Sequence, residues 1–166
     1  MGIKLEENPN ILYNILVILG LYCKVGRLMF LKDNQIDTTT YLSLREAVGW
    51  KALTEEQAQK ALQNSLVTVL AIDDGKPVGM GRIVGDGAVI CYIQDLIVIP
   101  EYQGKGLGTQ AVRFVKALYE DWLKITLVTP VEKKENVKFY TEKCGFRIVS
   151  AETDGNVELA RFVAER

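Results

Sequence analysis

Residues Gln103–Gly108 constrain the fold of this chain more than any other stretch, because they read Gln-Gly-Lys-Gly-Leu-Gly between an apolar run and an amphipathic one. Glycine accepts backbone conformations that other residues avoid, and it lets another molecule approach the main chain closely. The amphipathic run predicts a helix, whose first N–H groups and positive dipole end attract phosphate. The sequence therefore predicts a strand, a tight loop and a helix that together bind a phosphorylated cofactor.

Two well-known phosphate-binding loops do not fit this stretch. A P-loop ends in Gly-Lys-Ser/Thr, whereas Lys105 is followed by Gly106, so no hydroxyl is placed to hold magnesium. A dinucleotide fingerprint has the spacing G-x-G-x-x-G near the start of the fold. Here the spacing is G-x-G-x-G, and several strand-like runs precede it. Taken alone, the loop is also compatible with a plain tight turn before a helix.

The composition is typical of a single globular domain of 166 residues. Its 20 basic residues are balanced by 21 acidic ones, which argues against nucleic acid or an anionic membrane as a partner. The absence of histidine removes the usual imidazole base and most zinc sites, so no metal site is expected. Three scattered cysteines without a CxxC pair indicate free thiols in a reducing, cytoplasmic compartment.

Residues 1–24 are expected to form an extra segment ahead of a single domain of residues 25–166. The run from Ile11 to Cys23 is almost continuously apolar, but it is shorter than the roughly 20 apolar residues of a spanning helix. Two glutamates precede it and no small-residue cleavage site follows, which argues against a signal peptide. We expect a helix that packs on the domain or on a second subunit, so a homodimer is one expected assembly.

Hydrophobic periodicity and turn residues predict seven strands and four helices. The strands are expected over Arg27–Lys32, Leu66–Ile72, Pro77–Val84, Ala88–Ile99, Ile125–Val128, Phe146–Ser150 and Val157–Val163. The first helix follows N-cap candidates at 37–40 and ends near Gly49, and a capping box at 54–57 opens the second. The other two are expected over Gly106–Trp122 and Glu135–Lys143.

The glycine-rich loop resembles motif A of the GNAT acetyltransferases, Gln/Arg-x-x-Gly-x-Gly/Ala. Gln103, Gly106 and Gly108 match that motif position for position. The run Tyr92–Tyr102 before it is similar to the family's central strand and its exit.

A second motif lies downstream in the order and at the spacing of the same family. Asn136-Val-Lys-Phe-Tyr140, followed by Cys144-Gly145-Phe146, resembles motif B. The resemblance covers about residues 66–162, and more loosely extends back to about residue 28. It implies an α/β (α+β) fold, with a mixed, mostly antiparallel twisted sheet, helices on both faces and a splayed pair of central strands. The predicted order of strands and helices agrees with it.

The resemblance also implies acetyl-CoA as co-substrate. In the family, N–H groups of the loop bind the pyrophosphate, main-chain groups of the central strand pair with the pantetheine, and an Asn of motif B bonds the pantetheine arm. Carried over to this chain, the cofactor-binding residues are Leu96, Ile97, Val98, Gln103, Gly104, Lys105, Gly106, Leu107, Gly108, Thr109 and Asn136.

Tyr140 and Asp95 are the expected catalytic residues. The family's matching Tyr protonates the CoA sulfur, and a phenol with a pKa near 10 holds its proton at neutral pH. Asp95 is the carboxylate nearest the expected thioester; it is a base, an amine anchor or a strand-end residue that only hydrogen-bonds, and Tyr92 is the reserve base. No activated nucleophile is visible, so direct transfer in a ternary complex is expected.

The acceptor is expected to be a primary amine of a small molecule, bound by residues 45–53 facing Arg82. Trp50 either lines that pocket or anchors the core. Two other functions stay open at this point: acetylation of a protein or peptide N-terminus, and binding of acyl-CoA without turnover.

Overall fold

One eight-stranded sheet organises the computed structural model, which describes residues 22–25, 28–32, 36–118 and 124–165. The strands are β1 (Tyr22–Val25), β2 (Leu28–Lys32), β3 (Val67–Asp73), β4 (Lys76–Gly85), β5 (Ile90–Val98), β6 (Lys124–Pro130), β7 (Arg147–Asp154) and β8 (Val157–Glu165). The helices are α2 (Thr38–Ala47), α3 (Glu55–Gln63), α4 (Leu107–Leu118) and α5 (Lys134–Lys138), with a 3₁₀ turn over Pro100–Tyr102 and a π-helical turn over Phe139–Lys143.

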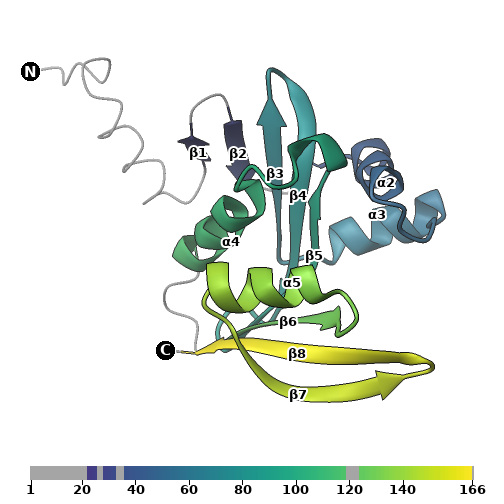
Figure 1. Ribbon diagram of the computed structural model, residues 1–166. Helices are drawn as coiled ribbons and strands as arrows, with labels where there is room; N and C mark the ends of the chain where they lie inside the picture. Colours follow the sequence, from purple (N-terminus) through teal and green to yellow (C-terminus); the bar gives the residue numbers. More distant parts are fainter. Residues whose placement is uncertain (1–21, 26–27, 33–35, 119–123, 166) are drawn as a thin grey trace, which may run out of the picture.

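The sheet has the order β1-β2-β3-β4-β5-β6-β8-β7, and every neighbouring pair is antiparallel except β5 and β6. Figure 1 shows α2 and α3 on one side of the sheet and α4 and α5 on the other. The predicted mixed, mostly antiparallel sheet with helices on both faces is therefore confirmed.

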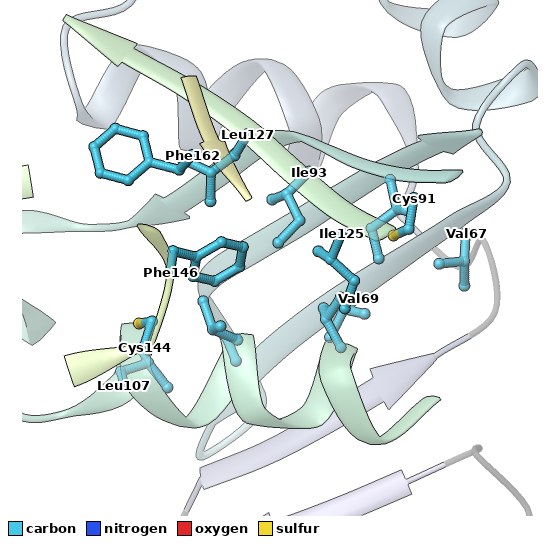
Figure 2. Close-up of a cluster of buried hydrophobic side chains, with 14 of the residues drawn as sticks. Val67, Val69, Cys91, Ile93, Leu107, Ile125, Leu127, Cys144, Phe146 and Phe162 are labelled. Atoms are coloured by element: carbon cyan, nitrogen blue, oxygen red, sulfur yellow. The ribbon is translucent and has the colours of Figure 1, made fainter. Parts of the chain in front are cut away.

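Two apolar cores lie on the two faces of the sheet. The larger one joins α4, Cys144 and Phe146 to side chains of β3, β5, β6 and β8, with Phe162 completely buried (Figure 2). The smaller one joins α2 and α3 to Leu70, Met80 and Ile97. Burial of about 25 cal/mol per Å² of apolar surface makes these two cores the main stabilising contribution.

A β-bulge in β5 changes which side chains face each core. Arg82 of β4 pairs with Asp95, but its neighbour Ile83 pairs with Ile93, so Gln94 is the extra residue. Because side chains alternate along a strand, one extra residue reverses the faces beyond it. Cys91 and Ile93 accordingly belong to the larger core, whereas Asp95 and Ile97 point to the side of α2 and α3.

Beyond the bulge, β5 and β6 separate. Their parallel pairing runs from Ile90 opposite Lys124 to Tyr92 opposite Thr126, and no later pair is formed between these two strands as described. β6 continues to Pro130 against β8, and β5 continues to Val98 against β4. The predicted splay of the central strand pair is thus confirmed (Figure 1).

Local signals in the sequence account for most of the helix boundaries. The Asp37 side chain accepts from the Thr40 N–H at the start of α2, and Thr54 and Gln57 form the expected capping box of α3. The expected helix 135–143 is instead one α-helical turn and a π-helical turn. The expected helix 106–122 is described as far as Leu118, and residues 119–122 lie outside the described residues.

Residues 22–24 depart from the expectation for the N-terminal segment. They lie in β1, antiparallel to β2, where a helix over residues 1–24 was predicted. Pairing with β2 satisfies those of their backbone groups that point toward β2. Residues 1–21 lie outside the described residues. None of the helices in the described part of the chain is long and apolar enough to cross a membrane.

Candidate active site

A groove of about 830 Å³ opens where β5 and β6 separate. One side consists of β5 and the loop into α4, and the opposite side consists of α5 and the π-helical turn. The lining residues are Val48, Trp50, Leu96, Ile97, Val98, Tyr102, Gln103, Gly104, Gly106, Leu107, Gly108, Thr109, Lys133, Glu135, Asn136, Phe139, Tyr140 and Lys143.

The glycine-rich loop adopts a backbone that only glycine accepts without strain. Gly104 and Gly106 have φ of 72° and 80°, in the left-handed region. Gly108 has another role, because a Cβ placed there would lie 3.0 Å from the Phe139 ring. The loop therefore turns sharply, packs against the opposite wall and leads directly into the first turn of α4, whose N–H groups have no acceptor within the helix.

The open edge of β5 carries main-chain groups that face the groove. Ile99 donates its N–H to the Val78 carbonyl, so the alternation of an antiparallel ladder turns the N–H and C=O groups of Leu96 and Val98 away from β4. The carbonyl of Val98 accepts a 2.9 Å hydrogen bond from Gln103 Nε2. The edge thus resembles an unpaired strand edge that an extended ligand can complete.

Asn136 and Tyr140 lie one helical turn apart on the opposite wall. Asn136 is exposed and its Nδ2 lies 3.3 Å from Thr129 Oγ1 on the diverging part of β6. The Tyr140 ring packs against Phe139, Phe146 and Phe162. Burial, and to a smaller extent the neighbouring Cys144, raises the pKa of the Tyr140 phenol well above its usual range, so Tyr140 keeps its proton at neutral pH.

Lysines gather around the groove. Lys133 and Lys143 line it, and Lys105 stands in the loop with its Nζ 4.9 Å from the centre of the Tyr102 ring. Tyr102 is itself fixed by a 2.6 Å hydrogen bond from its hydroxyl to Asp73. Cationic side chains around a concave surface raise the local concentration of anions. The groove therefore suits a long ligand that carries several phosphates.

Asp95 lies outside the groove lining, in a buried polar cluster under α2. It is 3% exposed, and its Oδ2 accepts from Tyr41 OH and from Arg82 Nε, each at 2.7 Å. Arg45 Nη1 lies 3.7 Å from Oδ1. Burial, and next the hydrogen bond to Asp95, raises the pKa of Tyr41. Both oxygens of Asp95 are therefore engaged by neighbouring donors or cations.

The structure brings together most of the residues that the sequence singled out. All of the expected cofactor residues except Lys105 line the groove, and so does Tyr140, while Asp95 points to the other side of β5. Sequence reasoning missed Tyr41 as a partner of Asp95, and it missed Lys133 and Lys143 in the lining. The position of the two lysines on either side of the Asn136–Tyr140 motif could have indicated that they line the site. Nothing in the sequence marks Tyr41 as a partner of Asp95.

Residues 34–146 match the model of the acetyltransferase (GNAT) family. The chain belongs to the GNAT family. A GNAT-family acetyltransferase from Streptococcus pneumoniae is 36% identical to it with a TM-score of 0.65, and the match covers 73% of this chain and 88% of that one. The Bacillus subtilis protein YrkN, described as uncharacterized, is 37% identical over 79 residues, which are 47% of this chain and 43% of that protein.

The cofactor of the GNAT family is acetyl-CoA. A family member from Elizabethkingia anophelis, solved with acetyl-CoA bound, is 16% identical to this chain, with a TM-score of 0.65 and coverage of 86% and 100% of the two chains. At that identity the likeness shows the fold alone. The chain spans about half the length of the curated relatives it matches.

Proposed function

We propose that this chain transfers the acetyl group of acetyl-CoA directly to a primary amine of a small molecule, in a ternary complex. One observation carries the proposal: the free edge of β5 lies in a groove that begins at the glycine-rich loop and the N-terminus of α4. A strand edge, a phosphate-attracting helix start and a proton donor then line one continuous surface.

Binding of CoA uses main-chain groups in this proposal. The diphosphate accepts from N–H groups of the loop and the first turn of α4, where Gly106 leaves open space. The amides of the pantetheine arm pair with Leu96 and Val98, and Asn136 holds the arm from the other wall. The Val98 carbonyl already accepts from Gln103 Nε2, and its second lone pair remains for a donor of the pantetheine arm.

The reaction itself is a nucleophilic substitution at the thioester. The lone pair of the neutral amine attacks the carbonyl carbon, the C–N bond forms, and the C–S bond then breaks as the tetrahedral intermediate collapses. Tyr140 gives its proton to the leaving thiolate. The nitrogen loses one proton as the amide forms, and this proton returns through water to the Tyr140 oxygen, so the products are an amide, the free thiol of CoA and a neutral Tyr140.

Asp95 has a structural role in this proposal rather than the role of a general base. Its Oδ2 accepts two hydrogen bonds and its Oδ1 faces a guanidinium, so no oxygen is directed to an incoming ammonium. The ammonium proton then leaves through water. Burial, and next the charge of Asp95, raise the pKa of Tyr92, so its phenol is protonated at neutral pH and does not accept that proton. The cytoplasmic location and the homodimer stay predictions of the sequence.

Calorimetry with acetyl-CoA, together with a thiol-release assay over a panel of amines and one short peptide, tests the proposal. The expected result is binding of acetyl-CoA and thiol release that depends on a small amine. Release that requires the peptide instead would assign the chain to peptide acetylation, and binding without release on any acceptor would leave only a binding module.

A matched pair of variants locates the binding site. Gly106→Asp introduces an anion beside the expected diphosphate, whereas Gly155→Asp introduces one in the β7–β8 turn. Both glycines have a left-handed φ, 80° and 60°, and both have open space at the Cβ position. The backbone strain is therefore comparable, and only Gly106→Asp is expected to weaken acetyl-CoA binding.

A further inference from the structure

Two guanidinium groups share one carboxylate on the sheet face that α2 and α3 cover. Arg82 donates from Nε to Asp95 Oδ2 at 2.7 Å, which is a full charge-assisted hydrogen bond. Arg45 approaches Oδ1 only to 3.7 Å, which is an ion pair but too long for a hydrogen bond. Because arginine stays charged in proteins, the cluster carries one more positive charge than its carboxylate balances.

Arg45 retains donor capacity that its neighbours do not use. Its Nη2 donates to the Lys51 carbonyl at 3.1 Å, while its Nε is buried and has no hydrogen-bond partner among the described residues. Only 14% of the side chain is exposed. A buried cationic donor without a partner is costly unless another group supplies the counter-charge. An anion beside Arg45 would supply it.

The Arg45 guanidinium lies beside an aromatic side chain that lines the groove, although Arg45 itself is not part of the lining. It lies 5.2 Å from the centre of the Trp50 ring and 5.5 Å from the centre of the Tyr41 ring. Trp50 is 38% exposed and lines the groove next to Val48, while Tyr140 lines the same groove from the opposite wall. Among the described residues, the positive charge of Arg45 that Asp95 does not balance is thus on the α2–α3 side of the groove, beside an exposed aromatic surface.

We propose that Arg45 and Trp50 select acceptor amines that carry a carboxylate and an apolar side chain, as apolar amino acids do. The acceptor carboxylate forms an ion pair with the exposed part of the Arg45 guanidinium, and the exposed face of Trp50 packs against the apolar part of the acceptor. A polyamine would instead meet the uncompensated positive charge. This inference rests on the proposed acetyl transfer and names the acceptor class for it.

The test compares acceptors that differ only at the carboxylate. Thiol release is measured with leucine and leucinamide, and with phenylalanine and phenylalaninamide, for the full chain and for three variants. The amide's amino group loses its proton more readily, which changes the acid-to-amide ratio of kcat/KM by the same factor in every variant. The quantity compared is therefore the change of this ratio from the parent chain to each variant, in which that factor cancels. Arg45→Gln removes the charge, Arg45→Lys keeps it, and Lys51→Gln removes an exposed charge nearby as the control.

A charge-assisted hydrogen bond corresponds to roughly a ten- to hundredfold preference. Arg45→Gln is expected to lower the acid-to-amide ratio by that factor, Lys51→Gln to leave it unchanged, and Arg45→Lys to keep part of it. Equal ratios in Arg45→Gln and the parent chain would overturn the inference while leaving acetyl transfer intact.

Binding measured without turnover separates this inference from the proposed function. With CoA present, calorimetry compares N-acetyl-leucine with N-acetyl-leucinamide. If N-acetyl-leucine binds more tightly than the amide, and Arg45→Gln abolishes this preference, a carboxylate site is supported. Absence of thiol release with every amine would then refute only the proposed transfer. Equal binding of the two compounds would overturn the carboxylate site. Circular dichroism and acetyl-CoA affinity report whether each variant is folded.

Discussion

Replacing Asp95 with asparagine is expected to destabilise the protein strongly. Asp95 is 3% exposed, the Arg82 side chain is 12% exposed, and Arg45 is the second cation in contact. Asp95→Asn keeps the size of the side chain but leaves two guanidinium groups without their counter-charge. Breaking a buried ion pair in this way costs about 3–5 kcal/mol of unfolding free energy.

Urea unfolding, followed by circular dichroism, measures this change directly. For a chain of this size about 1 kcal/mol corresponds to a shift of roughly 2–4 °C in Tm, so Tm is expected to fall by about 6–20 °C. Tyr41→Phe removes only one hydrogen bond to the carboxylate and is expected to cost about 2 kcal/mol. Glu152→Gln removes an exposed charge from β7 and is expected to stay within about 0.5 kcal/mol.

The kinetics of Asp95→Asn then separate the roles that the sequence left open. A structural role predicts a fall in kcat of less than about tenfold when the assay is run well below the lowered Tm. Loss of a general base predicts a fall of about 10²–10⁴-fold. An unfolding free energy within about 1 kcal/mol of the parent chain, or a fall in kcat larger than about a hundredfold in the folded variant, would refute a structural role for Asp95.

The proposed groove and its proton donor lead to three more predictions. Tyr140→Phe should lower kcat by about 10²–10⁴-fold with little change in acetyl-CoA affinity, in single-turnover and calorimetric measurements; an unchanged kcat would remove Tyr140 as the acid. Because burial raises the pKa of Tyr140 in the folded state, the unfolded chain ionises first, near pH 10. The unfolding free energy should therefore fall as pH rises above about 10, and less steeply in Tyr140→Phe, as urea titrations between pH 8 and 11 would show. Gly108→Leu places a side chain against the Phe139 ring, where even a Cβ would lie 3.0 Å away; it should weaken acetyl-CoA binding, whereas equal affinity would show that this contact does not shape the groove.

The fold was accessible from the sequence because several independent signals agreed. The apolar run of β5, the capping box at Thr54 and the turn glycines each fixed a local element. The two motifs placed these elements in the order of a known family. The strand β1 was missed because the run Ile11–Cys23 is apolar without the alternation that marks a half-buried strand.

The site was accessible from the sequence wherever main-chain groups form it. A glycine pattern reports backbone conformation, so the loop and its neighbours could be named residue by residue. The surroundings of Asp95 could not be predicted in this way, because the bulge at Gln94 determines which face of the sheet Asp95 points to. Its partners Tyr41 and Arg82 lie 54 and 13 positions away in the chain. The register of the β4–β5 pair brings Arg82 to Asp95, and the packing of α2 on the sheet brings Tyr41.

Residue-resolved amide hydrogen exchange with and without acetyl-CoA tests the central claim most directly. If the cofactor pairs with the open edge of β5 and binds at the N-terminus of α4, the amides of Leu96 and Val98 become protected from exchange. The amides of the loop at 104–109 become protected as well. The amides of the β7–β8 turn should not change. Tight binding of acetyl-CoA that leaves the exchange of Leu96 and Val98 unchanged would contradict the account.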